Sequence, residues 1–477
     1  MIGATFDGDL SNPDPLNSES LSSELRTRAE SNMFEPGRLG QTREPSSRSA
    51  ALTAANGAGY HRARAPWGAL PPDMRPPPNE PGRERALRIA LFADSFHEVN
   101  GFALTCRQFH AFARRRGLPF MTYVSGPDAQ LWAEGGTCLS QLACSSASIP
   151  VDGALAFDPL CGRHYRRIKQ ELEIFQPDLV HFTSLGNCGI LGQIVAKRLG
   201  IPTVASWHTN LHEFGALRLG SVVPFLPDAT RKSLCDFVER FCLAGIAEFY
   251  RPARMIFAPN EELASLLETR TGKPARIMRR GVDSRLFSPE KRTRTDDTFV
   301  LGFVGRLNAE KNVRLLRAVE EALISAGRPN FKFVIVGAGG EKEWLEENMQ
   351  NAEFPGVLEG ENLARAYANL DLFLFPSHSD TFGNVIQESH ASGVPAVVTS
   401  SGGPKFLVED GVDGFVARDD RHFIECVLKA MDAHAGFAEM RLAAREQGEQ
   451  ASWDRVFENL HDDYQVCYGM LQRGEIT

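Results

Sequence analysis

From Leu87 onward the chain alternates short apolar runs with longer amphipathic stretches. Residues 87–93 form a continuous apolar run, which is typical of a strand buried on both faces. The same pattern predicts further strands over 119–124, 178–182, 202–206 and 254–258. It predicts helices over 101–116, 164–174 and 189–199, and another beginning at Asn260. Such alternation predicts a parallel, doubly wound α/β sheet.

The pattern starts again after a connection near residues 280–297. Strands are predicted over 298–304, 331–336, 372–375 and 396–399, with helices over 313–325, 342–349 and 363–368 and from about 384. An amphipathic helix over 453–471 ends the chain. We therefore predict two Rossmann-like domains, 86–283 and 284–450, and a C-terminal segment, 451–477.

Residues 1–85 have a different composition. They are rich in Ser, Pro, Arg and Glu, include the run Pro76–Pro78, and keep no apolar period. Such a segment cannot bury enough apolar surface to offset its ordering entropy. We predict a disordered N-terminal arm without a catalytic role.

Composition narrows the function classes. A net charge of −8 and a pI of about 5.9 argue against nucleic acid as a partner. The nine cysteines are scattered and form no CxxC pair, which favours isolated thiols in a reducing compartment. No apolar run reaches the ~18 residues of a membrane span, and the N-terminus lacks a signal-like pattern. We expect a cytoplasmic protein, with peripheral contact on the inner membrane face left open.

Candidate ligand residues follow the predicted strands, where open parallel sheets bind ligands. Asp94–Phe96 and then Asn100–Gly101 follow the first strand, and a glycine that opens a helix lets a phosphate approach backbone amides. His208 follows the strand over 202–206, where it would contact a sugar hydroxyl. The alternatives are an ordinary turn at Gly101 and a structural histidine at position 208.

Two loops of the second half carry more chemistry. Gly305–Asn312 contains Arg306 and Lys311, two cations able to clamp a diphosphate unless the loop is a solvated charged turn. Pro376–Glu388 follows a buried strand directly. It holds Asp380, a tight entry at Gly383, and free amides at the start of a helix, which suit an anion. Glu388, one turn inside that helix, would accept hydrogen bonds from vicinal hydroxyls.

Together these motifs resemble the retaining family-four glycosyltransferases, which have the two-domain GT-B fold. The resemblance rests on the motifs Asn100-Gly101, Trp207-His208-Thr209, Arg280-Gly281-Val282-Asp283, Gly305 to Asn312, Ser379 to Pro395 and Asp410 to Phe415. It covers about residues 86–470. It implies that parallel sheets of the two domains face a cleft, with the acceptor on the first domain and the nucleotide sugar on the second. It also implies that the C-terminal helix within 451–477 crosses back to the N-terminal domain.

The resemblance also implies roles for single residues. Arg306 and Lys311 would neutralise the diphosphate of the donor, Glu388 would hold its ribose, and Asp380 its sugar hydroxyls. His208 would lie near the reacting carbon. The remaining contacts to the donor would come from Gly101, Gly305, Phe382, Gly383, Asn384 and Val385. Members of the family act with retention of configuration and without a metal, and these groups would stabilise the leaving diphosphate, so the resemblance implies neither a metal nor a cofactor. Asp380 stands where the family more often has Glu, which leaves the donor sugar open. Phe102 stands where the family has a smaller residue after the Asn-Gly pair, which leaves the fit at that loop open.

The expected substrates are a UDP- or GDP-linked sugar and an acceptor hydroxyl. The version of the motif at Asp380-Thr381-Phe382-Gly383 resembles that of enzymes that glycosylate diacylglycerol or phosphatidylinositol, which makes a membrane lipid the expected acceptor. A surface for docking on anionic lipid heads would come from the apolar stretch 217–250 and from basic residues of the first domain: Arg114–Arg116, Arg163, Arg166, Arg167 and Lys169. Solvated helix faces are the alternative explanation of those residues. A soluble sugar or polysaccharide acceptor is the alternative function, and a non-catalytic nucleotide-sugar-binding regulator is a rival class. A dinucleotide oxidoreductase is ranked last, because no GxGxxG follows residues 87–93.

Overall fold

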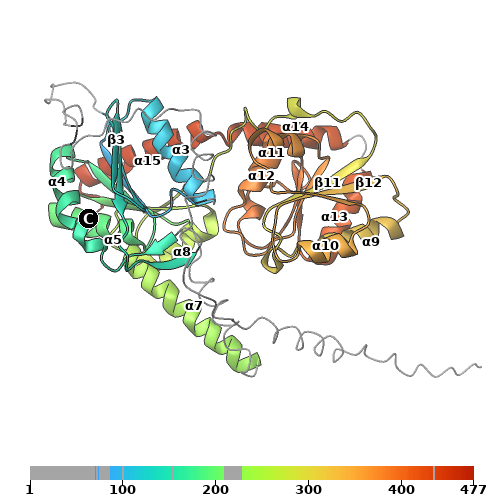
Figure 1. Cartoon of the computed structure of the whole chain (residues 1–477), viewed down its shortest axis with the longest axis horizontal. Coiled ribbons are helices and arrows are strands. Elements are labelled where there is room, and N and C mark those ends of the chain that lie inside the picture. The colour runs from blue at the N-terminus through green and yellow to red at the C-terminus, as the bar shows by residue number, and fades with distance from the viewer. Residues whose placement is uncertain are drawn as a thin grey trace, which may run out of the picture. The chain divides into compact units, whose positions relative to one another are not determined.

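The computed structural model describes residues 70, 74, 86–98, 101–152, 155–208, 228–432 and 436–476. These residues form two α/β domains, each built on its own sheet (Figure 1). Leu70 and Met74, which lie within the predicted arm, are buried in the core of the first domain. The rest of the predicted arm lies outside the described residues.

The first domain holds an eight-stranded sheet in the order β10-β9-β8-β7-β1-β2-β4-β3. Neighbouring strands are parallel except β3, which is antiparallel to β4. The strands are β1 (Ile89–Ala93), β2 (Phe120–Gly126), β3 (Gln130–Glu134), β4 (Thr137–Ala143), β7 (Leu179–Phe182), β8 (Thr203–Ser206), β9 (Ile256–Ala258) and β10 (Ala275–Ile277). A separate antiparallel ribbon pairs β5 (Ile149–Asp152) with β6 (Leu155–Phe157).

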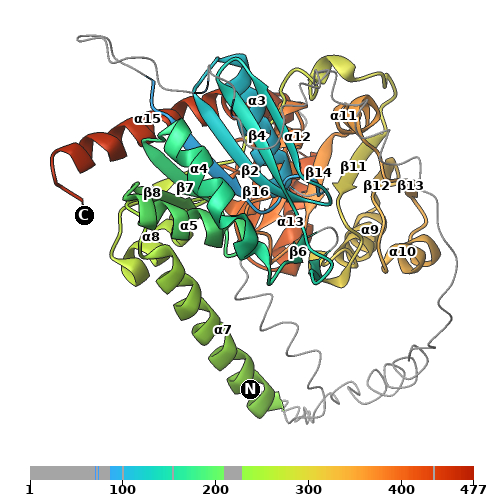
Figure 2. The ribbon, with the colours of Figure 1, turned by 60° about the vertical axis from the view of Figure 1, so that its left-hand side comes forward.

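Helices cover both faces of this sheet. Successive side chains of its central strands point to opposite faces, and the side chains on both faces are buried and mostly apolar. In β1, Ala90 and Phe92 pack on the face covered by α4, α5, α7 and α8, while Ile89 and Leu91 pack on the face covered by α3 and α15. Figure 2 shows this arrangement. The helices of this domain are α3 (Gly101–Arg115), η2 (Cys161–His164), α4 (Tyr165–Phe175), α5 (Asn187–Leu199), α7 (Asp228–Tyr250) and α8 (Glu261–Thr271).

The second domain holds a six-stranded, wholly parallel sheet in the order β13-β12-β11-β14-β15-β16. Its strands are β11 (Phe299–Val304), β12 (Phe331–Val336), β13 (Ala352–Gly356), β14 (Leu372–Phe375), β15 (Ala396–Thr399) and β16 (Gly414–Ala417). Counted along the chain this order reads 3-2-1-4-5-6, as in Rossmann dinucleotide-binding domains.

The helices of the second domain enclose one continuous hydrophobic core. They are η3 (Pro289–Lys291), η4 (Ala309–Lys311), α9 (Leu315–Ser325), α10 (Lys342–Asn348), α11 (Gly360–Ala368), α12 (Asn384–Ala391), η5 (Pro404–Phe406), α13 (Asp420–Asp432) and α14 (Gly436–Gln450). The last helix, α15 (Trp453–Gln472), packs on α3 of the first domain instead. Phe457 of α15 stacks on Phe109 of α3 with ring centroids 4.7 Å apart.

The predicted two-domain α/β fold is confirmed. The strands predicted over 331–336, 372–375 and 396–399 have those bounds. The pattern did not predict β3 to β6, β10, β13 or β16. Of these, β3, β10, β13 and β16 are edge strands, β5 and β6 form the separate ribbon, and β4 is an inner strand of seven residues.

Candidate functional site

The strand order of the second sheet reverses between β11 and β14, which are hydrogen-bonded neighbours. The loops leaving the two strands therefore diverge at their carboxyl ends and open a crevice, the usual ligand site of such sheets. The loop after β11 carries Arg306 and Lys311, and the loop after β14 carries Asp380. The topology thus brings the predicted charged residues of both loops to one edge.

Lys311 and Asp380 form an ion pair across this edge. Lys311 Nζ lies 2.8 Å from Asp380 Oδ1 and 2.7 Å from Oδ2. The side chain of Lys311 is 11% exposed and that of Asp380 23% exposed, so the pair is largely shielded from water. Lys311 closes η4, and Asn312 then turns in the left-handed conformation at φ 50°. An incoming anion would meet a lysine whose position is already fixed.

The sequence predicts that the side chains of Arg306 and Lys311 converge, but the side chain of Arg306 does not join the Lys311–Asp380 pair. Its guanidinium pairs with Glu310 at 2.8 Å, and its side chain is 61% exposed. It therefore faces solvent beside the crevice. Gly305 and Gly337 pack backbone to backbone, since a Cβ on Gly337 would lie 1.9 Å from the carbonyl oxygen of Gly305. This contact holds the loop of Arg306 against the loop after β12.

Helix α12 begins at Asn384 directly beside the ion pair. Gly383 occupies the N-cap at φ 102°, a conformation that favours glycine, and no side chain caps the helix. The amides of Asn384 and Val385 have no partner within the helix and suit a phosphate, whereas the amide of Ile386 donates to the carbonyl of Gly383 at 3.0 Å. Phe382, the residue before the cap, is buried.

The loop after β15 supports this helix start from behind. The amide of Gly403 donates to the carbonyl of Asp380 at 2.7 Å. A Cβ on Gly403 would lie 1.9 Å from the carbonyl oxygen of Thr381, so only glycine fits there without displacing the loop. Gly403 is a site residue that the sequence analysis missed, although a Gly-Gly pair after a buried strand was the available signal.

Glu388 lies in the second turn of α12 and is partly buried. Loss of solvent raises the pKa of its carboxyl to about 7, and the hydroxyl of Tyr367 opposes that rise. Burial thus favours the protonated form of this carboxyl. The carboxyl can accept or donate hydrogen bonds to a diol.

His208 is buried on the first domain. Its ring stacks on Phe102, with centroids 4.1 Å apart and planes 23° apart, and its Nε2 lies 2.6 Å from Ser206 Oγ. Burial, followed by the nearby Arg280 guanidinium, lowers the pKa of His208 well below its ordinary value. The imidazole is therefore neutral. Thr209 and Asn100, which belong to two of the predicted motifs, lie outside the described residues.

Arg280 links the two domains at this point and was not predicted as a site residue. Its Nη1 donates to Asn384 Oδ1 at 3.3 Å, and its Nη2 donates to the carbonyl of His208 at 3.1 Å. A Cβ on Gly101 would lie 2.6 Å from Arg280 Nη1 and 2.6 Å from Asn384 Nδ2. Gly101, His208, Arg280 and Asn384 therefore meet in one place.

The corresponding switch point of the first sheet is already occupied by Asp94. Its carboxylate accepts from the amides of Cys188 at 2.6 Å and Gly189 at 3.2 Å at the start of α5, and from Ser184 Oγ at 2.8 Å. Burial raises the pKa of Asp94 to about 6 despite these bonds. A carboxylate from the chain thus fills the anion position at α5, while the start of α12 has no such cap.

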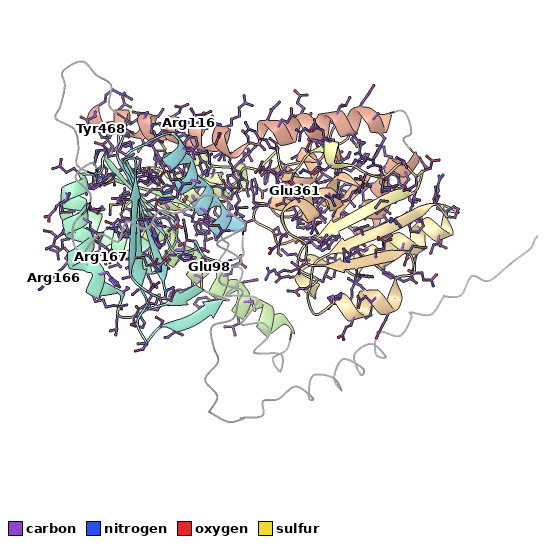
Figure 3. The ribbon with its side chains drawn as sticks, turned by 45° about the horizontal axis from the view of Figure 1, so that its top comes forward. Glu98, Arg116, Arg166, Arg167, Glu361 and Tyr468 are labelled. Atoms are coloured by element: carbon purple, nitrogen blue, oxygen red, sulfur yellow. The ribbon has the colours of Figure 1, made fainter. Side chains whose placement is uncertain are left out.

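Most of the basic residues predicted to face a membrane are paired within the protein. Arg115 and Arg116 pair with Asp454 and Glu458 of α15. The other pairs are Arg114 with Glu134, Arg163 with Asp158, Arg167 with Glu171, and Lys169 with Glu173. Arg166 is exposed on α4 (Figure 3). Structural pairing thus accounts for most of this cluster.

Three further observations concern a cavity, metal-ion sites and membrane-spanning helices. A cavity of about 560 Å³ between β10, α12, α14 and α15 is lined by Arg280 but by none of the predicted site residues. Within the described ranges, no group of three His, Cys, Asp or Glu side chains is arranged to hold a metal ion. Among the helices that the structure describes, none has the length and apolar character needed to cross a bilayer.

Two Rossmann-like domains define the GT-B class of glycosyltransferases. Residues 99–286 match the model of Glycosyltransferase Family 4, and residues 298–433 match that of Glycosyl transferases group 1. The chain is 27% identical over 418 residues to a GDP-mannose-dependent alpha-mannosyltransferase of Corynebacterium glutamicum, covering 82% of this chain and 92% of the relative. A protein with the same name from Mycolicibacterium smegmatis is 32% identical over 305 residues, covering 62% of this chain and 75% of the relative.

The structure of this chain is also similar to solved structures of other proteins. A sucrose-phosphate synthase from Thermosynechococcus elongatus aligns with a TM-score of 0.56 at 18% identity, covering 80% of this chain and 99% of that structure. The chain belongs to glycosyltransferase family 4. It is a glycosyltransferase that uses a nucleotide sugar.

Proposed function

We propose that this enzyme transfers mannose from GDP-mannose, with retention of anomeric configuration, to a hydroxyl of a membrane lipid. The observation that carries the donor site is the Lys311–Asp380 ion pair beside the uncapped start of α12. The choice of GDP-mannose rests on the alpha-mannosyltransferase relative, of which this chain covers 92%.

The chemistry follows from where charge develops. Breaking the anomeric C–O bond places negative charge on the leaving diphosphate and positive charge on the sugar ring. Lys311 and the amides of Asn384 and Val385 would stabilise the diphosphate, and Arg306 would join them by leaving Glu310. Asp380 would then hold sugar hydroxyls, and Glu388 the ribose diol.

We expect these groups to neutralise the diphosphate without a metal ion. A lysine and helix-terminal amides supply charge and hydrogen bonds that need no reorganisation during the reaction. The acceptor proton would pass to an oxygen of the leaving phosphate, which lies on the same face of the sugar. Added chelator should therefore leave the rate unchanged.

A lipid acceptor is supported by an exposed aromatic pair on α7. Phe237 and Phe241 are 59% and 71% exposed, and their rings stack with centroids 6.4 Å apart. Helix α7 extends away from the sheet of the first domain (Figures 1 and 2). Exposed aromatic rings at i and i+4 of a projecting helix are suited to the bilayer interface. Of the predicted apolar stretch 217–250, residues 217–227 lie outside the described residues.

The donor proposal is tested by a panel of GDP- and UDP-linked sugars with membrane lipid extract, scored for nucleotide release and for labelled glycolipid. GDP-mannose should be the donor whose release depends on the lipid. Lipid-dependent release from another donor alone would replace GDP-mannose in the proposal. No acceptor-dependent release from any donor would contradict it.

The membrane contact is tested by vesicle sedimentation of a Phe237→Ser/Phe241→Ser variant. We expect weaker binding to lipid vesicles than for wild type. Leu442→Ser is the matched control, because Leu442 is 72% exposed on α14 of the second domain. Equal vesicle binding by the wild type and the α7 variant would contradict a role of this pair at the membrane.

A further inference from the structure

We propose that Tyr464, on the C-terminal helix, fixes the tautomer of His208 through His181 and Ser206, so that His208 serves as a hydrogen-bond donor through Nδ1. This inference rests on the proposed function only where it assigns His208 to the donor sugar. Tyr464 and His181 would be positioning residues, since they act on substrate through His208 alone.

A buried line of hydrogen bonds joins the four residues. Tyr464 Oη lies 2.6 Å from His181 Nδ1, and His181 Nε2 lies 2.9 Å from Ser206 Oγ. Ser206 Oγ in turn lies 2.6 Å from His208 Nε2. Tyr464 and Ser206 are 0% exposed, His181 1% and His208 7%. The line runs from α15, across strands β7 and β8 of the sheet, to the site.

Both imidazoles are neutral, so each carries one proton. Burial lowers the pKa of His181 to about 3 and that of His208 well below its ordinary value. A neutral imidazole donates from one ring nitrogen and accepts at the other. Two directions of the whole line are therefore consistent, and each direction sets both tautomers. In a third arrangement Ser206 Oγ would accept from both imidazoles, but its own O–H would then be a buried donor without a partner among the described residues.

The phenol decides between these directions. In the first, Tyr464 donates to His181 Nδ1, His181 Nε2–H donates to Ser206, and Ser206 donates to His208 Nε2. In the second, every bond is reversed and the Tyr464 O–H becomes a buried donor that needs another acceptor. His181 Nδ1 is the hydrogen-bond partner that the described residues provide for this hydroxyl. An unsatisfied buried donor costs about 1–3 kcal/mol, so the first direction dominates.

The packing of α15 fixes the position of the Tyr464 phenol. Tyr464 lies in the same buried cluster as Trp453, Phe457 and Leu460 of α15 and the side chains of α3. Its ring also meets the ring of Phe257 on β9 edge to face at 5.9 Å. The helix thus holds the hydroxyl against His181 with little freedom to turn.

The consequence concerns the chemistry of His208. With Nε2 accepting from Ser206, the proton of His208 stays on Nδ1. His208 can then donate to an oxygen of the bound sugar nucleotide. It cannot take up the acceptor proton at Nε2, which is occupied by Ser206. The line therefore assigns His208 to binding and polarisation and excludes it as the general base.

The test reads the tautomers directly. The full chain is labelled with ¹⁵N-histidine, and two-bond ¹H–¹⁵N spectra are recorded, with signals assigned from His181→Gln and His208→Gln. We expect His208 to be protonated on Nδ1 and His181 on Nε2. In Tyr464→Phe, which keeps the ring but removes the hydroxyl, His208 should populate both tautomers. Protonation of wild-type His208 on Nε2, or the same single tautomer in Tyr464→Phe, would overturn the proposal.

Tyr468→Phe is the matched control, because Tyr468 lies one turn further along α15 and is partly buried against the same cluster (labelled in Figure 3). It should keep the wild-type tautomers. If the enzyme is active with GDP-mannose, Tyr464→Phe should lower kcat/KM in proportion to the fraction of His208 that is no longer protonated on Nδ1, about twofold for equally populated tautomers. If GDP-mannose is not a donor, the proposed function fails while the spectra still decide on the line of hydrogen bonds.

Discussion

Replacing Lys311 by Met separates the catalytic role of its charge from its structural role. The substitution keeps the apolar stem and removes the ammonium group, which bonds both oxygens of Asp380 at 2.8 and 2.7 Å. A fully buried carboxylate left unpaired costs about 3–5 kcal/mol, and an exposed one about 0–1 kcal/mol. Asp380 is 23% exposed, which places the expected loss of unfolding free energy between these limits, at about 1–2 kcal/mol.

The loss in the reaction should be larger. Removing one preorganised donor from a developing anion costs about 3 kcal/mol, or ~10²-fold in rate. Single-turnover transfer from GDP-mannose measures the rate, and urea unfolding measures the stability. Lys332→Met is the matched control, because Lys332 pairs with the exposed Glu353 and lies at the amino-terminal end of β12, opposite the strand ends that carry the site. This variant should react normally.

A double variant isolates the stability cost of the unpaired carboxylate. Asp380→Asn removes the carboxylate that Lys311→Met leaves unpaired, so adding it should restore much of the stability. It should not restore the rate, because the charge that faces the diphosphate stays missing and Asp380 is itself proposed to hold the sugar. A Lys311→Met enzyme with the wild-type rate would refute this role of Lys311. A double variant that recovers the rate would show that the loss came from the ion pair alone.

Two further outcomes follow from the site. Burial raises the pKa of Glu388 from 4.5 to about 7. The folded state therefore binds the proton of Glu388 more tightly than the unfolded state does. As a result, this residue lowers the free energy of unfolding as the pH rises from about 4.5 to 7. Glu388→Gln should therefore stabilise the protein more at about pH 8 than at about pH 5 in urea unfolding, and an equal effect at both would contradict the assignment. Gly403→Ala should displace the Thr381 carbonyl and weaken donor binding by calorimetry, whereas Gly340→Ala, whose Cβ meets open space, should not. Equal donor affinity in these two glycine variants would show that the loop after β15 does not support the site.

Apolar runs predicted the sheet strands well because each central strand is buried on both faces. Residues 372–375 are fully apolar, and the strand has those bounds. By contrast, β3 has the polar ends Gln130 and Glu134 and lies at the sheet edge, where burial on one face leaves little pattern. Edge strands of this kind need their pairing partner to be recognised.

Spacing also predicted the start of α12 at Asn384, because Gly383 supplies the positive φ that the turn requires. It did not predict where long side chains point. Arg306 and Lys311 have the same charge in the same loop, yet one pairs outward with Glu310 and the other inward with Asp380. Arg280 was a motif residue without an assigned role, because its partners His208 and Asn384 come from distant segments of the chain.

The most direct test of the account is a crystal structure with GDP-mannose bound. We predict that the diphosphate lies against the first-turn amides of α12 and within hydrogen-bond distance of Lys311 Nζ. Diphosphate density at any other place, such as the cavity between β10 and α15, would contradict the central claim.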